Sequence, residues 1–381
     1  MQTNDVTVER LRELARRSGN GKVLSVYVNL DPTQFATMGA RSTEVTSVLD
    51  QAGRMIREAD ELSREERRDL RADLERLREF FGTDLAAKVR GAHGLAVFSS
   101  QTAVLFESLR LPRPVEQTVV IDSAPFIEPL ASLGPADSWA VALLNRRDGC
   151  ILRGSRDGFG EVESLSDDVP GWHHQGGWSQ ANYQRHIEQK AIEHVHRVCH
   201  ALFARYQRQP FDHLVVAAPE ELWPVVDDAL HPYLKERLIG RLQTDILGAG
   251  AEQIHDAARP ILLEHERRRE RKALDRLAEG VGNGRRGAAG LPDVLDALTQ
   301  RRVETLLVAE SFHAPGVSCS SCGWLGTEVE RCPVDGAAVQ HRDDIVEAAV
   351  EAAVLQDSEV IFTRHFPDLG PLGSIGAVLR F

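Results

Sequence analysis

The sequence contains no run of about 18 apolar residues, which is the length that a membrane-spanning helix needs. Its opening residues, Met1-Gln2-Thr3-Asn4-Asp5, carry an early acid and lead into no apolar signal-peptide core. We therefore expect no transmembrane segment, no signal peptide and no membrane partner. These absences predict a cytoplasmic protein.

An excess of basic residues is also missing, because 57 acidic residues face 45 basic ones and the net charge is −12. A protein dedicated to nucleic acid usually carries a basic excess, so the balance argues against that class while leaving local patches open. The main basic run, Glu264–Lys272, has mixed signs and is interpreted as a solvated helix face with ion pairs. No Walker loop, Rossmann glycine fingerprint or nucleophile elbow occurs.

Cysteine is scarce and unevenly placed. Three of the five cysteines lie within Cys319–Cys332, whereas Cys150 and Cys199 stand alone. This spacing favours a reducing compartment and a metal site over a disulfide framework. Cys199 falls on an apolar helical stripe, which predicts a place in a hydrophobic core.

A chain of 381 residues is long enough to bury several hydrophobic cores, and we predict three α/β domains. Their predicted ranges are 1–135, 136–279 and 288–381. In the first domain, Val23–Leu30 is a predicted strand and Thr43–Phe80 has helical spacing. The glycines of Glu279–Gly287 predict a flexible connection between the second and third domains.

The second and third segments alternate strands and helices, which predicts mixed or parallel sheets. His213–Ala218 is almost wholly apolar, as a buried central strand should be. The remaining predicted strands are Ser138–Leu144, Gly149–Arg153, Gly160–Leu165, Arg237–Leu242, Val303–Ala309, Glu359–Thr363 and Ser374–Phe381. The predicted helices are Ser179–Arg208, Ala251–Ala278, Leu291–Thr299 and Asp344–Gln356.

A glycine pair, Gly176-Gly177, lies in the polar loop between a predicted strand and the helix from Ser179. Two adjacent glycines permit a sharp bend or a close approach to another surface. The candidate contact residues of this loop are Trp172, His173, His174, Gln175, Trp178, Ser179 and Gln180. Two tryptophans in a loop predict a surface that stacks on a partner, and the alternative is that they cover their own domain.

The order of these features resembles the archaeal and eukaryotic class-1 release factors and Pelota, and more closely their bacterial relatives. In that family a Gly-Gly-Gln-Ser loop precedes a long helix in the central domain. The last domain ends in a turn and strand like Gly373-Ser374-Ile375-Gly376 and Ala377–Phe381. The resemblance covers roughly residues 136–381, and the first domain matches only in being α/β.

The resemblance implies three α/β domains, of which the central one is RNase H-like. The last is a small ribosomal-protein-like domain with a zinc-ribbon-like insertion. It also implies ribosome and tRNA as partners, with a translational GTPase as a candidate delivery factor. In the family, the glutamine after the glycine pair helps water attack the peptidyl-tRNA ester, by the logic of an oxyanion hole.

Trp178 stands where the family has glutamine, so the enzymatic role stays open. Gln180 or Gln175 could replace that glutamine and keep ester hydrolysis or tRNA cleavage in ribosome rescue, with Gly176, Gly177 and Trp178 forming the rest of the catalytic loop. Alternatively, Trp178 stacks on RNA, worth about 1–3 kcal/mol per base, in a non-catalytic factor that occupies the ribosomal A site. The third alternative is a zinc-stabilised protein-interaction module.

Two short knuckles occupy residues 319–336. Cys319-x-x-Cys322-Gly is followed by Cys332-x-x-Asp335-Gly, with aspartate where a zinc ribbon has its fourth cysteine. A carboxylate is an acceptable zinc ligand, so Cys319, Cys322, Cys332 and Asp335 are the predicted set. His313 or His341 remains an alternative fourth ligand, and the predicted zinc is structural.

Overall fold

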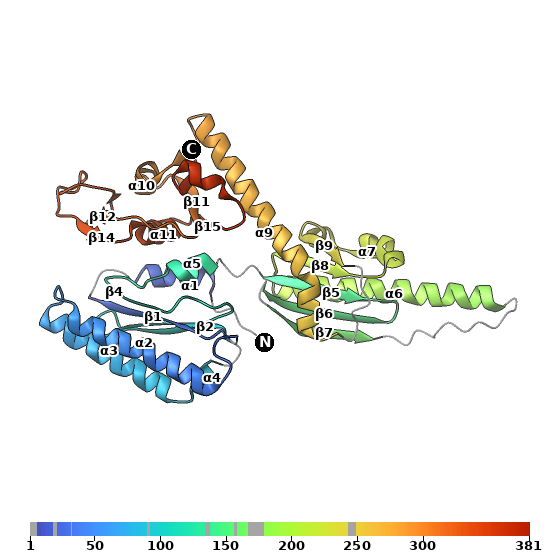
Figure 1. Ribbon diagram of the computed structural model, residues 1–381. Helices are drawn as coiled ribbons and strands as arrows, with labels where there is room; N and C mark the ends of the chain where they lie inside the picture. The colour runs from blue at the N-terminus through green and yellow to red at the C-terminus, as the bar shows by residue number, and fades with distance from the viewer. Residues whose placement is uncertain are drawn as a thin grey trace. The chain divides into compact units, whose positions relative to one another are not determined.

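The computed structural model describes residues 6–17, 21–31, 33–89, 92–133, 138–155, 158–166, 179–242 and 249–381 (Figure 1). The chain forms two compact units. One is Ala136–Glu266, and the other combines Asn4–Pro135 with Arg267–Phe381. The α/β class predicted from the sequence is confirmed. Within the described ranges, no helix combines the length and apolar character needed to cross a membrane.

The N-terminal part of the larger unit is an antiparallel sheet of order β3-β2-β1-β4 with helices on both faces (Figure 1). Alternation along β1 places Leu24 and Val26 against α2 and α3, and Val23 and Tyr27 against α1 and α5. The elements are α1 Val8–Ala15, β1 Val23–Asn29, α2 Met38–Glu58, α3 Arg64–Gly82, α4 Leu85–Lys88, β2 Gly94–Ser100, β3 Leu105–Leu111, β4 Thr118–Asp122 and α5 Glu128–Leu133.

The helical stretch predicted over Thr43–Phe80 consists of two helices, because a cap interrupts it at Ser63. The Ser63 hydroxyl accepts a hydrogen bond from the Glu66 N–H at 3.2 Å, and the Glu66 carboxylate accepts one from the Ser63 N–H at 2.9 Å. This capping box satisfies two amides that would otherwise lack partners at the start of α3. The chain can therefore turn between α2 and α3 and lay both on the same face of the sheet.

The smaller unit is built on a five-stranded sheet of order β7-β6-β5-β8-β9, in which β5–β7 are antiparallel and β5, β8 and β9 are parallel. This order is that of the expected RNase H-like fold, and β8 is the buried inner strand that its sequence predicted. Cys199 is buried in the core between the sheet and α6, as predicted. The elements are β5 Trp139–Leu144, β6 Asp148–Ser155, β7 Gly158–Ser166, α6 Ser179–Arg208, β8 His213–Ala217, η1 Glu220–Leu222, α7 Trp223–Ala229, α8 Pro232–Lys235, β9 Leu238–Leu242 and the first part of α9 Ala251–Gly282, a helix whose residues from Arg267 on belong to the larger unit.

The C-terminal part of the larger unit contains a mixed sheet of order β10-β16-β11-β15, with a small sheet β13-β12-β14 beside it. One face of the mixed sheet packs on α10 and α11, and Leu307 and Val378 on the other face contact Leu274 and Leu277 of α9. The elements are β10 Gly287–Ala289, α10 Leu291–Thr299, β11 Val303–Ala309, β12 Gly316–Ser318, β13 Leu325–Gly326, β14 Gln340–Arg342, α11 Ile345–Leu355, β15 Glu359–Thr363, η2 Pro367–Leu372 and β16 Ile375–Leu379.

The flexible connection predicted over Glu279–Gly287 is wrong. Helix α9 continues through Gly282, and the Arg285 N–H donates to the Gly280 carbonyl at 3.2 Å. A Cβ atom at Gly280 would lie 2.5 Å from the Arg286 carbonyl oxygen. Glycine is therefore required here for close packing of the helix end against the following turn.

Candidate functional site

The glycine-pair loop is framed by two elements of the smaller unit. Strand β7 ends at Ser166, and helix α6 begins at Ser179. The predicted contact residues Trp172, His173, His174, Gln175, Gly176, Gly177 and Trp178 lie outside the described residues. Ser179 and Gln180 belong to the first turn of α6, and the roles predicted for their side chains remain predictions.

Helix α6 is held on the central sheet by close packing. Its residues Val195, Val198 and Leu202 are buried in the core of the unit. At Gly149 of β6, an added Cβ would lie 2.4 Å from a methyl group of Val198. The absence of a side chain at Gly149 thus permits the helix to approach the strand, which fixes the position of the helix that follows the loop.

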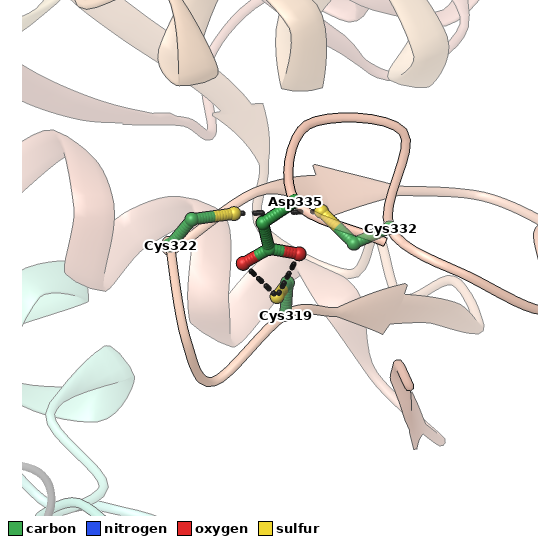
Figure 2. Close-up of side chains that lie close together, drawn as sticks. All are labelled: Cys319, Cys322, Cys332 and Asp335. Carbon is green, nitrogen blue, oxygen red and sulfur yellow. Dashed lines mark hydrogen bonds between the residues drawn. The ribbon is translucent and has the colours of Figure 1, made fainter. Parts of the chain in front are cut away.

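The two predicted knuckles bring their four side chains together, and Figure 2 shows these side chains pointing toward one another. One candidate ligand atom from each of Cys319, Cys322, Cys332 and Asp335 lies within 4.8 Å of all the others. The Cys322 and Cys332 sulfurs are 3.4 Å apart, and the Cys319 sulfur is 3.5 Å from Asp335 Oδ2. Among the predicted alternatives for the fourth ligand, His313 contacts Asp344 instead.

Both knuckles have the same backbone turn. The Gly323 N–H donates to the Cys319 carbonyl and the Gly336 N–H to the Cys332 carbonyl, each at 2.9 Å. Both glycines have a positive φ, +75° and +74°, which explains why glycine follows each knuckle. Asp335 therefore occupies in the second turn the position that Cys322 occupies in the first.

The knuckle distances fit a tetrahedral zinc ion. With zinc–sulfur bonds of about 2.3 Å and zinc–oxygen bonds of about 2.1 Å, tetrahedral angles require ligand separations of roughly 3.6–3.8 Å. The observed separations of 3.4 and 3.5 Å are close to these values. The hydrogen bond from the Ala337 N–H lowers the pKa of Asp335, and the one from the Cys322 N–H lowers that of the Cys319 thiol. The pKa of Cys322 is instead raised to about 12, because the lowering effect of a hydrogen bond from the Trp324 N–H is outweighed by burial and by the Cys332 and Cys319 side chains.

A second convergence of side chains was not predicted from the sequence. Glu128 of α5, His313 and Asp344 approach one another within the larger unit, beside a cleft of about 1280 Å³. His313 Nδ1 lies 2.6 Å from Asp344 Oδ2. Single residues in loops and at helix ends carry no periodic signal, so nothing in the sequence groups these three.

Several further acidic side chains lie near Glu128, His313 and Asp344. Asp122 of β4 forms an ion pair with Arg342 of β14, and Glu347 and Glu351 lie on α11 nearby. Burial, followed by the charges of Asp122 and Glu128, raises the pKa of Glu347 to about 8. Burial also raises the pKa of Glu351 to about 7, against the opposing effect of Arg342. One arginine thus faces several carboxylates.

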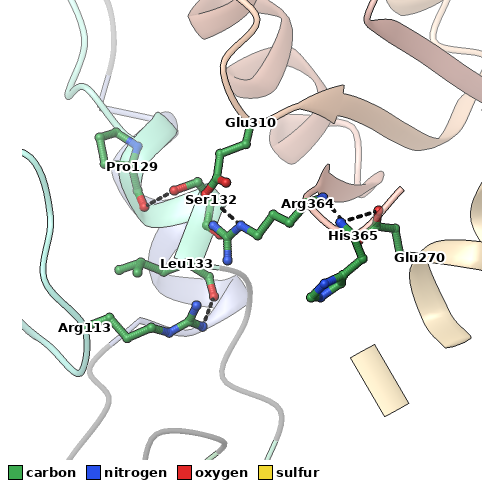
Figure 3. A network of polar contacts seen from close by, with 8 residues as sticks. All are labelled: Arg113, Pro129, Ser132, Leu133, Glu270, Glu310, Arg364 and His365. Carbon is green, nitrogen blue, oxygen red and sulfur yellow. Dashed lines mark hydrogen bonds and ion pairs between the residues drawn. The ribbon is translucent and has the colours of Figure 1, made fainter. Parts of the chain in front are cut away.

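Arg364 links three segments of the larger unit, as Figure 3 shows. Its guanidinium donates to the Ser132 carbonyl at 2.8 Å and pairs with Glu310 at 2.8 Å. Its backbone N–H donates to the buried carboxylate of Glu270, which also accepts from the N–H groups of His365 and Phe366. The segment after β15 is therefore tied both to α9 and to the end of α5.

The basic run Glu264–Lys272 forms ion pairs, but the partners lie outside the run and Glu270 within it is buried, so the interpretation as a solvated helix face holds only in part. Arg269 pairs with Glu359 at 2.6 Å, and Arg271 pairs with Asp368 at 3.1 Å. These arginines are committed to partners within the larger unit. The run therefore provides less free positive charge than its sequence shows.

Residues 125–262 match a family described as "Bacterial archaeo-eukaryotic release factor family 10". The chain is 27% identical over 332 residues to peptide chain release factor subunit 1 of Pyrococcus abyssi, covering 76% of this chain and 79% of that protein. It is 29% identical over 230 residues to the protein of the same name from Methanopyrus kandleri, covering 57% of this chain and 55% of that one. It also aligns with an archaeal Pelota described as ribosome-bound with ABCE1, at 15% identity and a TM-score of 0.42, covering 100% and 95% of the two chains.

Proposed function

Because the chain belongs to the superfamily of archaeo-eukaryotic release factors and Pelota-like proteins, we propose that it binds the ribosome beside a tRNA. The observation that supports this proposal most directly is the similarity to a peptide chain release factor across 76% of the chain. A translational GTPase is the proposed delivery partner. The larger unit is the candidate region for protein contacts.

The proposed action is ribosome rescue by hydrolysis of the peptidyl-tRNA ester. Water attacks the ester carbonyl, the bond to the tRNA ribose oxygen breaks, and that oxygen takes a proton. The backbone N–H groups of Gly177 and Trp178 are the proposed donors to the developing oxyanion, and Gln180 is the proposed group that orients water. Gly176 and Gly177 provide the narrow backbone that this approach requires.

The test uses the purified full chain on stalled ribosomes that carry a nascent peptide on tRNA. We expect peptide release by the natural chain and a loss of about a hundredfold in Gly177→Ala, the scale for disturbing one oxyanion donor. Gln180→Ala should also lose activity. The matched controls are Gly82→Ala, where an added Cβ meets nothing within 4 Å, and Gln189→Ala on the exposed face of α6. Release that is equally fast in all variants would refute the assignment.

Trp178 favours a second candidate, a non-catalytic factor that occupies the ribosomal A site. An indole stacks on bases instead of orienting water, and each stack is worth about 1–3 kcal/mol. In this case the chain should co-sediment with ribosomes without releasing peptide. Trp178→Ala should weaken that binding about 5- to 150-fold, as the stacking energy implies. Unchanged binding of Trp178→Ala argues against the stacking role.

We also propose that the knuckles of Cys319, Cys322, Cys332 and Asp335 bind a structural zinc ion. The donor set of three thiols and one carboxyl, with no open position among the four, suits a structural site. Purified protein should contain one equivalent of zinc that Cys322→Ser loses. Asp335→Cys, which completes four thiolates, should retain it and resist chelators better. Protein that is free of zinc and equally stable with and without chelator would disprove the site.

A further inference from the structure

Three potential metal ligands from distant parts of the sequence meet within the larger unit. Glu128 begins α5, His313 follows β11, and Asp344 caps α11. One donor atom of each lies within 4.8 Å of both others. The set is distinct from the knuckle residues and contains an imidazole and two carboxylates, a combination that binds first-row transition metals.

Glu128 lacks the partner that a buried carboxylate normally has. Its exposed fraction is only 9%, and no described residue donates a hydrogen bond to its carboxylate. A buried, unpaired carboxylate is costly unless a cation or donors compensate its charge. Of the two charged groups that face it, the Asp344 carboxylate repels its charge and His313 attracts it.

The other two ligands are already held in position. Asp344 Oδ1 accepts the N–H of Val346 at 3.0 Å and of Ala314 at 3.3 Å, which leaves Oδ2 directed at His313. The His313 side chain is 65% exposed, and both His313 and Glu128 line the adjoining cleft. An ion can therefore reach the three side chains, and water can complete its coordination.

We propose that Glu128, His313 and Asp344 bind a divalent first-row cation, of which Mn²⁺ is the diagnostic probe. The ion replaces the proton shared by His313 Nδ1 and Asp344 Oδ2, and it neutralises the unpaired Glu128. Its ligands come from both sequence segments of the larger unit, 4–135 and 267–381. The bound ion would therefore hold α5 to the start of α11.

The test is an Mn²⁺ titration of the purified full chain, with free Mn²⁺ counted by electron paramagnetic resonance. Mn²⁺ prefers carboxylate and imidazole over thiolate, so the knuckles do not compete. We expect one bound Mn²⁺ per chain, and binding at least about tenfold weaker in Glu128→Gln and in His313→Ala.

The matched control is Asp343→Asn, because Asp343 is exposed, carries the same charge and adjoins Asp344 outside the ligand set. It should keep the natural affinity. Thermal unfolding supplies a second measurement: Mn²⁺ should raise the Tm of the natural chain and of Asp343→Asn, but not of His313→Ala. The proposal is overturned if no Mn²⁺ binds at millimolar concentration, or if Asp343→Asn weakens binding as much as Glu128→Gln.

Discussion

At the scale of single residues, Glu270 demonstrates how a charged side chain can act as an internal part of the fold. It is buried, with 4% exposure, and its carboxylate accepts hydrogen bonds from the N–H groups of Arg364, His365 and Phe366. In the sequence, Glu270 is one residue of the charged run Glu264–Lys272, and nothing distinguishes it from neighbours that are expected to be exposed to solvent. Burial of one member depends on the loop packed against it, which the run itself does not encode.

Replacing Glu270 with glutamine should destabilise the larger unit by about 2–3 kcal/mol. The amide loses the charge that strengthens three hydrogen bonds, and its NH₂ group points a donor toward backbone donors. Urea denaturation measures the change. Glu279→Gln, at an exposed position of the same helix, should stay within about 0.5 kcal/mol of the natural chain. Equal stability of the two variants would contradict the role given to Glu270.

Glu351 should make the stability of the larger unit depend on pH. Its pKa is raised from 4.5 to about 7, chiefly by burial, so the folded state holds a proton that the unfolded state releases above pH 4.5. Below pH 4.5 both states are protonated and the group costs nothing. As pH rises from about 4.5 through 7, the unfolded state gains relative stability, and the cost is complete above that window.

Glu351→Gln should therefore stabilise the unit by about 1–3 kcal/mol at pH 8.5 and leave it unchanged at pH 4.5. Thermal unfolding at the two pH values tests this prediction. Exposed Glu328 provides the control substitution Glu328→Gln, which should have no effect at either pH. A gain that is the same at both pH values would show that packing, and not ionisation, is responsible.

At the scale of elements, the regular spacing of apolar residues predicted the bounds of several helices and strands correctly. Helix α10 has the predicted bounds Leu291–Thr299, and β11 and β15 also begin and end where predicted. Helix α5 was missed because six residues are too few for a helical period to emerge, and strand β4 was missed as well. Gly280 was misjudged because tertiary contact, and not local flexibility, selects glycine there.

Gly149→Ala should disturb the packing of α6 against the five-stranded sheet of the smaller unit. Its Cβ would lie 2.4 Å from Val198, so the helix must shift or the strand must bend, at a cost of about 1–3 kcal/mol. Because α6 directly follows the glycine-pair loop, peptide release or ribosome binding should decrease as well. Gly160→Ala in β7 is the control, since its Cβ would meet the nearest atom at 4.0 Å. Natural stability in Gly149→Ala would contradict this packing argument.

At the scale of the whole molecule, the two sequence segments of the larger unit are joined by polar contacts that no local pattern could reveal. Arg342 and Asp122 form an ion pair although they are 220 residues apart in the sequence. Arg12 pairs with Asp357 at 2.9 Å, and Arg364 donates to the Ser132 carbonyl. A single sequence gives the α/β character of each segment, but it does not specify which surfaces meet.

Arg342→Gln should destabilise the larger unit by about 3–5 kcal/mol, because it leaves the largely buried Asp122 carboxylate without its ion-pair partner. Arg331→Gln, at an exposed position in the knuckle region, should be nearly neutral. Unfolding curves of both variants test the prediction, and it fails if Arg342→Gln is as stable as Arg331→Gln.

Residues 4–135 and 267–381 form one compact unit, so during synthesis the first segment must wait for the second before the unit can be completed. The first sheet has its own hydrophobic core and can form early, yet the partner of its Asp122 is not made until Arg342 leaves the ribosome. Throughout that interval, the acidic side chains of β4 and α5 face water instead of α11. A chain truncated near position 340 would therefore leave that early surface uncovered.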